Sequence, residues 1–149
     1  DDALIDAIMA IGATTALQLH GQETPERAAQ LRARTGLAVW KAIPVKTADD
    51  LASAANYASA VDHLLYDAKT PDGAALPGGM GQRFDWTLLA GHRAPLPWGL
   101  SGGLDAENVA QAIRTTKAPL VDVSSGVESA PGVKDVDKIA AFCKAVQSC

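Results

Sequence analysis

Two segments in the second half of the chain have the composition of phosphate-binding loops. Residues 98–104 read WGLSGGL and residues 120–128 read LVDVSSGVE. Each is a short apolar run that ends in glycine or serine, where backbone N–H groups can reach a phosphate because no bulky side chain covers them. Two such loops on consecutive parallel strands, about twenty residues apart, are typical of the phosphate site of a (β/α)8 barrel. The sequence therefore predicts a phosphorylated small molecule as the ligand.

Polar residues also stand near the ends of the earlier strand-like runs. His20 follows the apolar run at 17–19, Lys41 lies within the run at 39–45, and Asp67 ends the run at 63–67. In α/β folds the carboxyl ends of parallel strands meet at one edge of the sheet, and ligands bind at that edge. One histidine, one aspartate and two phosphate loops are thus predicted to converge on one site.

The elements that position these residues alternate between short strands and amphipathic helices, which requires a parallel sheet with right-handed crossovers. A flavodoxin-like open sheet satisfies the same alternation, so the loop chemistry decides in favour of the barrel. We predict one domain over 1–149. The expected helices are 2–12, 25–34, one from 47, 85–89, one starting at 105–108 and one over 136–146; the expected strands are 17–20, 39–45, 63–67, 98–101 and 119–123.

Composition excludes several classes of protein. The net charge of −4, with lysine and arginine scattered singly, argues against nucleic acid and against a basic membrane-binding face, and no apolar run is long enough to span a membrane. The acidic start of the chain is not a signal peptide. Cys143 and Cys149 are too close together for a disulfide framework. The predicted location is therefore the cytoplasm.

Five segments, taken together, carry a resemblance to a known family. The segments are LQLHG at 17–21, LLYDAK at 64–69, GGMG at 78–81 with FDW at 84–86, LSGGL at 100–104 with NV at 108–109, and VDVSSGVE at 121–128 with PG at 131–132 and KD at 134–135. In this order and spacing they resemble phosphoribosylanthranilate isomerase, a (β/α)8 barrel enzyme of tryptophan biosynthesis. The resemblance runs from about residue 17 to the last helix.

The resemblance implies an Amadori rearrangement of N-(5-phosphoribosyl)anthranilate that needs no metal and no cofactor. A general acid protonates the ribose ring oxygen and opens the ring to a Schiff base, and a general base then removes the proton on C2. By resemblance Asp67 is the acid, which must carry its proton near neutral pH; desolvation or the like charge of Asp122 could favour that state. Without a catalytic role, Asp67 would be a strand-end residue that caps a turn.

The resemblance also implies the substrate-binding residues. Gly102, Gly103, Ser124, Ser125 and Gly126 would hold the ribose phosphate, although glycines at such positions also serve tight turns. His20 matches a histidine that lines the family's pocket. Lys41 could face the lumen and meet a carboxylate, such as that of anthranilate, or it could be a structural lysine. His63 and His92 are expected to be structural.

The sequence also departs from the family pattern. Met80 stands where the family has a small or polar residue between glycines. The family's general base, a cysteine after the first strand, and an arginine after the second strand have no counterpart, because only about the last five of the eight βα units are recognisable. We expect such a five-unit portion to be inactive alone, with its open sheet edges completed by residues outside this sequence or by another copy. A monomer and a homodimer are both compatible with this.

Two other functions remain open at this stage. One is another phosphate-binding barrel enzyme, such as indole-glycerol phosphate synthase. That family would require a catalytic lysine and a glutamate at strand ends, whereas the strand at 63–67 ends in Asp67, which favours the isomerase. The other is a non-catalytic phosphosugar-binding or assembly module, a possibility that the missing base suggests.

Overall fold

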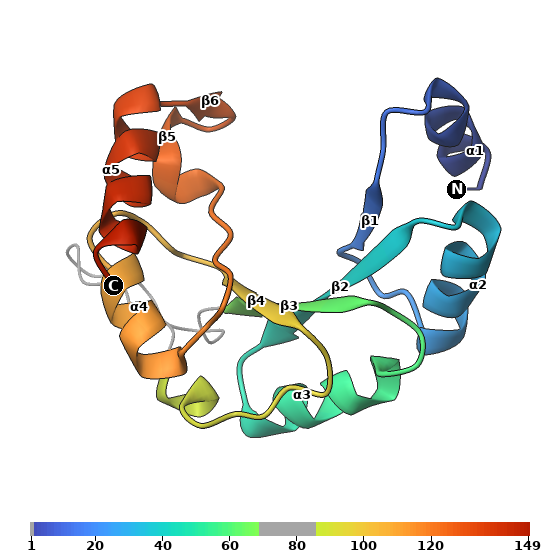
Figure 1. Ribbon diagram of the computed structural model, residues 1–149, viewed down its shortest axis with the longest axis horizontal. Helices are drawn as coiled ribbons and strands as arrows, with labels where there is room; N and C mark the ends of the chain where they lie inside the picture. Colours follow the sequence, from blue (N-terminus) through green and yellow to red (C-terminus); the bar gives the residue numbers. More distant parts are fainter. Residues whose placement is uncertain (1, 69–85) are drawn as a thin grey trace.

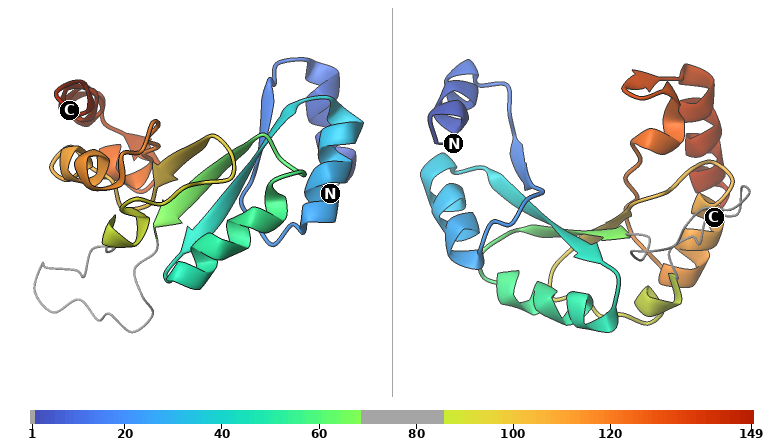
Figure 2. Two further views of the ribbon diagram at one scale, coloured as in Figure 1. Left: turned by 60° about the horizontal axis from the view of Figure 1, so that its bottom comes forward. Right: turned by 180° about the vertical axis from the view of Figure 1, so that it is seen from behind.

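The fold was obtained as a computed structural model, which describes residues 2–68 and 86–149. The chain follows an arc, with the strands along the inner side and the helices along the outer side (Figure 1). The view from behind in Figure 2 shows the same two layers, with helix α1 (Asp2–Ile11) at one tip of the arc and the hairpin of strands β5 (Glu128–Ala130) and β6 (Val133–Lys134) at the other. The fold is α/β, as the alternating pattern predicts.

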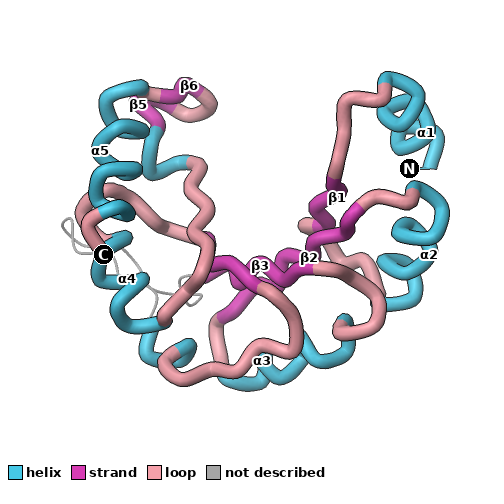
Figure 3. The backbone as a smooth tube through the Cα atoms, in the orientation of Figure 1, coloured by secondary structure: helices cyan, strands magenta, loops and turns pink. Residues whose placement is uncertain are grey.

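The described elements follow the predicted order closely. The helices are α1 (Asp2–Ile11), α2 (Pro25–Thr35), α3 (Ala48–Ser53), α4 (Val109–Thr116) and α5 (Val136–Gln147), with 3₁₀ helices η1 (Ala54–Tyr57), η2 (Trp86–Leu89) and η3 (Ser125–Val127). The strands are β1 (Ala16–Leu19), β2 (Ala38–Val45), β3 (His63–Ala68), β4 (Trp98–Ser101), β5 (Glu128–Ala130) and β6 (Val133–Lys134). Figure 3 separates helices, strands and connecting loops by colour.

Strands β1 to β4 form one parallel sheet in the order of the sequence. The elements that connect them pack on the outer face, as right-handed crossovers require. Helix α2 has the expected ends: the Thr24 side chain accepts a hydrogen bond from the Arg27 backbone N–H at 3.3 Å, Pro25 is the first helical residue, and Gly36 ends the helix at φ 67°. These local signals determine where the chain turns back to the next strand.

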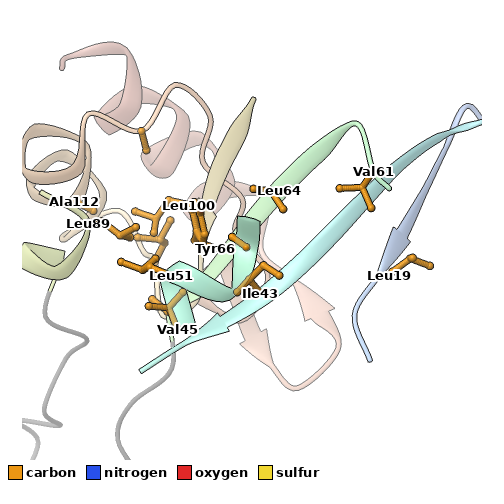
Figure 4. Close-up of a cluster of buried hydrophobic side chains, with 14 of the residues drawn as sticks. Leu19, Ile43, Val45, Leu51, Val61, Leu64, Tyr66, Leu89, Leu100 and Ala112 are labelled. Atoms are coloured by element: carbon orange, nitrogen blue, oxygen red, sulfur yellow. The ribbon is translucent and has the colours of Figure 1, made fainter. Parts of the chain in front are cut away.

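The main core lies between the sheet and the outer helices. Alternate residues of β2 and β3 face this layer, because successive side chains of a strand point to opposite faces. Val39, Ile43 and Val45 belong to it from β2, and Leu64 and Tyr66 from β3. Figure 4 shows part of this cluster; its labelled side chains are Leu19, Ile43, Val45, Leu51, Val61, Leu64, Tyr66, Leu89, Leu100 and Ala112. The other alternate residues, which include Asp67 of β3 and its β4 neighbour Ser101, face the inner side of the arc.

Three predicted elements differ from the structure. The strand expected at 119–123 is wrong in extent: only Val121 forms a bridge, with Leu100. Leu100 donates to the Leu120 carbonyl and accepts from the Asp122 N–H, and this segment makes no longer ladder with β4. The helix expected from 105–108 begins at Val109, after a turn, and the one expected at 85–89 is a 3₁₀ helix at Trp86–Leu89.

The β5–β6 hairpin was not predicted from the sequence. Glu128 pairs with Lys134 and Ala130 pairs with Val133 around a turn in which Gly132 has a φ of 79°. Helix α5 begins immediately after the hairpin, where the Asp135 carboxylate accepts hydrogen bonds from the N–H groups of Asp137 and Lys138. The hairpin therefore brings Lys134 back toward the loop at 124–126.

Among residues 2–68 and 86–149, none of the helices combines the length and the apolar character that crossing a membrane would require. The predicted loop features at Gly79, Met80 and Gly81 lie outside the described residues.

Candidate active site

The carboxyl ends of the parallel strands bring Asp67 and His20 together. Asp67 is 6% exposed and lies near the end of β3, whereas His20 follows β1. The His20 Nε2 atom is 3.6 Å from an Asp67 carboxylate oxygen, although the His20 side chain is 66% exposed. The predicted convergence of these two residues at one edge of the sheet is therefore present.

The first glycine loop lies directly against Asp67. Gly102 has a φ of 90°, and a Cβ atom there would lie 2.7 Å from Asp67 Oδ1 and 2.3 Å from the Ala68 carbonyl oxygen. Atoms at these distances would overlap, so this position accepts only glycine without displacement of the β3 end. The Asp67 carboxyl thus lies on the same side of the sheet as this loop.

The second glycine loop packs against the first. A Cβ atom on Gly126 would lie 1.8 Å from the Leu104 carbonyl oxygen and 3.2 Å from the Asp105 Cα atom. The absence of a side chain at Gly126 is what allows the two backbones to approach so closely. Residues 102–105 and 124–126 therefore form one continuous backbone surface beside Asp67.

Side chains of the loop itself fix the conformation of 103–108. Asn108, which is 2% exposed, donates to the Gly103 carbonyl at 2.9 Å and accepts from the Asp105 N–H at 3.0 Å. The Asp105 carboxylate accepts from the N–H groups of Glu107 and Asn108, each at 2.9 Å. A buried asparagine with both amide ends bonded to backbone rigidifies the loop. Sequence reasoning noted Asn108 in a motif without giving it this role.

The β5–β6 hairpin supports the second loop. Lys134 Nζ donates to the Ser124 carbonyl at 2.9 Å, to Ser124 Oγ at 3.0 Å and to Glu128 Oε1 at 2.7 Å. The hydrogen bond from Lys134, with a second one from the Gly132 N–H, holds the pKa of the Glu128 carboxyl below its usual value. Lys134 is a residue that spacing alone did not single out, because its position depends on the hairpin.

Asp122 lies on the inner side but is exposed. The bridge of Leu100 with Val121 puts β4 between Asp122 and Asp67. Two strand spacings amount to about 10 Å, which is comparable to the Debye length at physiological ionic strength. This is a spacing between backbones, and because Asp67 is buried the effect of the Asp122 charge on it stays a prediction.

Of the two roles considered for Lys41, the lumen-facing one is wrong and the structural one is present. Lys41 has the same orientation on β2 as Val39 and Ile43, which face the helices, and its side chain is 3% exposed. Its Nζ donates to the Gly21 carbonyl at 2.6 Å and to Glu23 Oε2 at 3.0 Å. Lys41 does meet a carboxylate, but that carboxylate belongs to this chain.

The other histidines lie away from this site, as expected. His63 stacks on Trp40 at the amino end of β3, with the ring centroids 4.6 Å apart. His92 Nε2 lies 2.8 Å from the Tyr66 hydroxyl on the helix side of the sheet. Burial lowers the pKa of His92 and raises the pKa of Tyr66 to about 12.

Within the described part of the chain, no group of three or more histidine, cysteine, aspartate or glutamate side chains could hold a metal ion. The two cysteines, Cys143 on α5 and Cys149 after it, are exposed.

Comparison with known proteins decides the family. The family profile of N-(5'phosphoribosyl)anthranilate (PRA) isomerase matches residues 1–145. An N-(5'-phosphoribosyl)anthranilate isomerase of Zymomonas mobilis is 56% identical over 149 residues, which cover 99% of this chain and 69% of that protein. One from Rhodospirillum rubrum is 52% identical over 147 residues, which cover 99% of this chain and 67% of that protein. The chain belongs to the phosphoribosylanthranilate isomerase family.

Solved isomerases of the family share the fold. The Thermotoga maritima phosphoribosylanthranilate isomerase superposes with a TM-score of 0.82 at 38% identity, covering 99% of this chain and 68% of that one. A second isomerase was crystallised with reduced 1-(o-carboxyphenylamino)-1-deoxyribulose 5-phosphate. It gives a TM-score of 0.79 at 34% identity, and the match covers 99% of this chain and 66% of that one. The parallel sheet is thus TIM-barrel-like rather than flavodoxin-like, and the alternative of indole-glycerol phosphate synthase is not favoured.

Proposed function

We propose that this isomerase catalyses the Amadori rearrangement of N-(5-phosphoribosyl)anthranilate, a step of tryptophan biosynthesis, with Asp67 as the general acid. The observation that carries the proposal is the contact of the Asp67 carboxyl with Gly102, which puts a buried acid next to two packed glycine loops. Asp67 would protonate the furanose ring oxygen as the C1–O bond breaks, leaving a Schiff base. Loss of the C2 proton to a base then gives an enolamine, which tautomerises to the ketone.

The two loops would hold the phosphate at the other end of the ribose. Gly102, Gly103, Ser124, Ser125 and Gly126 would present backbone N–H groups and hydroxyls to its oxygens. Their arrangement as one surface supports this assignment, because a phosphate needs several donors within a few ångströms. Binding the phosphate firmly would fix the distance from the furanose oxygen to Asp67. Catalysis gains from such positioning because the acid and the atom that it protonates are held in reacting geometry. His20 would contact the substrate beside Asp67, and Asp122 would line the same inner side.

We further propose that residues 1–149 supply about the last five βα units of the barrel, and that the base comes from another part of it. The coverage of 69% of the Zymomonas mobilis isomerase supports this. So does the position of both cysteines of the described chain, which are exposed and belong to α5 and the residues after it. A polypeptide of these residues alone would then bind the phosphosugar without converting it. This non-catalytic binding is the second candidate function.

Replacement of Asp67 tests the proposed acid. In the intact isomerase Asp67→Asn should lower kcat by roughly 10²- to 10⁴-fold, because the amide has no acidic proton to donate. Its affinity for reduced 1-(o-carboxyphenylamino)-1-deoxyribulose 5-phosphate, measured by calorimetry, should stay within about threefold of the parent value. Asp62→Asn is the matched control: Asp62 precedes β3 and its carboxylate accepts from the Val39 N–H at 2.8 Å, at the opposite end of the strands. Near-parental turnover of Asp67→Asn would reject the acid role.

A further inference from the structure

An ion pair between buried Lys41 and half-buried Glu23 holds the backbone of the residue that follows His20. Lys41 Nζ donates to the Gly21 carbonyl at 2.6 Å, while Glu23 Oε2 accepts from the Gly21 N–H at 3.0 Å. Lys41 and Glu23 also bond to each other at 3.0 Å. Both polar backbone groups of Gly21 are therefore held by the two charged ends of one ion pair, which leaves this residue little freedom of rotation.

Other contacts fix the ion pair in turn. The Tyr57 hydroxyl donates to the Glu23 carbonyl at 2.7 Å, and Lys41 Nζ lies 5.8 Å from the Tyr57 ring centroid. Burial alone would raise the pKa of the Glu23 carboxyl, but the hydrogen bonds from Lys41 and from the Gly21 N–H hold that pKa below its usual value. A Cβ atom on Gly21 would lie 2.9 Å from Glu23 Oε1, so a side chain at this position would displace the end of the Glu23 side chain.

His20 has little else to fix its position. Its side chain is 66% exposed, and its Nε2 atom lies 3.6 Å from Asp67. An exposed imidazole without close packing takes its position from its backbone, and that backbone joins Gly21 directly. The placement of His20 beside Asp67 therefore depends on how Gly21 is held.

Stability is a weak explanation for this ion pair. Lys41 occupies a position on β2 whose neighbours on the same face, Val39 and Ile43, are core residues. Replacement of a buried ion pair by apolar side chains of similar volume is often neutral or stabilising, whereas removal of one partner is strongly destabilising. The free energy of folding therefore does not explain a lysine at this position. Its hydrogen bond to the Gly21 carbonyl gives another explanation.

We propose that Lys41 and Glu23 are positioning residues of the reaction: through Gly21 they hold the His20 imidazole at the edge of the Asp67 carboxyl. The catalytic consequence rests on the proposed function, but the placement of His20 can be measured without turnover. The effect of Lys41 and Glu23 passes through one peptide unit to His20 and from His20 to the acid.

The test compares the single variant Lys41→Met with the double variant Lys41→Met/Glu23→Leu in the intact isomerase. The single variant should lose both thermal stability and turnover, since it leaves Glu23 unpaired. The double variant should regain a melting temperature near the parent value while kcat stays roughly 10- to 100-fold low and KM changes by less than about threefold. In both variants the NMR shifts of the His20 ring should move toward those of a free imidazole. Arg32→Met, which breaks the Arg32–Asp62 pair, is the control and should leave kcat and the His20 shifts unchanged.

Recovery of kcat together with stability in the double variant, with parental His20 shifts, would overturn the inference and leave Lys41 a purely structural residue. If Lys41→Met does not fold, the double variant decides by itself. Failure of the proposed function has a different signature: the parent protein would not convert phosphoribosylanthranilate, while the His20 shifts would still respond to the double variant.

Discussion

Substitutions of Gly102 and of Gly103 test the proposed acid and the proposed phosphate-binding surface separately. Gly102 and Gly103 are adjacent and both have positive φ angles, 90° and 63°. Alanine at either position is strained by about 1–2 kcal/mol, because an L-residue in the left-handed region brings Cβ too close to the backbone. At Gly103 a Cβ atom meets nothing within 4 Å, so this strain is the whole effect.

At Gly102 a clash is added to the strain. The new Cβ atom would lie 2.3 Å from the Ala68 carbonyl oxygen and 2.7 Å from Asp67 Oδ1, whereas real Cβ contacts are essentially never shorter than 3.0 Å. The end of β3 or the loop must therefore move by about 0.7 Å, which as overpacking costs about a further 1–3 kcal/mol. We expect Gly102→Ala to lower the free energy of unfolding by about 2–5 kcal/mol, against about 1–2 kcal/mol for Gly103→Ala.

The displacement falls on Asp67 itself, so turnover should suffer as well. A misplacement of about 1 Å can lower the rate about 10²-fold, and we expect a loss of that order in kcat for Gly102→Ala. Gly103→Ala should mainly raise KM, since it changes only the part of the loop proposed to bind phosphate. Guanidinium unfolding and steady-state kinetics of both variants make the comparison. Equal effects of the two substitutions on stability and kcat would refute the reasoning, because only the clash with the β3 end distinguishes them.

Three further predictions concern the loops and the titrating groups. Gly126→Ala should weaken calorimetric binding of the reduced product analogue at least about tenfold, by separating the two loops; unchanged affinity would show that their contact is irrelevant to binding. Lys134→Met should raise the pKa of Glu128 in an NMR titration, since the hydrogen bond that lowers it is lost; an unmoved titration would assign the shift to another group. His92→Gln should flatten the acid loss of stability between roughly pH 7 and pH 5. The pKa of His92 is lowered in the folded state, so its contribution to the free energy of unfolding is present above the usual histidine pKa and disappears as the pH falls. Urea unfolding at both pH values measures this free energy. The same loss of stability between the two pH values in the variant and the parent would contradict the prediction.

The sequence was most informative where local chemistry acts within a few residues. Thr24, Pro25 and Gly36 defined helix α2, and the alternation of apolar runs defined the four parallel strands. The same logic overestimated the strand at 119–123, because a strand needs a partner along its whole length and only Leu100 pairs with Val121. Short periodic runs show which residues favour a strand, but they do not show how many hydrogen bonds the neighbouring strand can offer.

The site residues also divide into those that local sequence signals could predict and those that depend on contacts between distant residues. The convergence of His20 and Asp67 could be predicted, since parallel strands end at one edge of a sheet. The role of Lys41 could not, because the direction of a side chain on a strand depends on which of two alternating faces meets the helices. Glu23 was missed, and Lys134 was noted only as part of a motif, for a related reason: each acts on a residue to which only a loop or a hairpin brings it.

By itself the sequence determined the order of strands and helices and the two glycine loops, because capping, alternation and glycine content act over short stretches of chain. The family followed from the resemblance of five segments, taken in their order and spacing. Only the tertiary structure decided that Gly126 packs on Leu104, that Gly102 lies against Asp67, and that Lys41 turns toward the helices. These outcomes depend on contacts between residues distant in the chain, whose distances are set by how the sheet curves and how the outer helices pack on it.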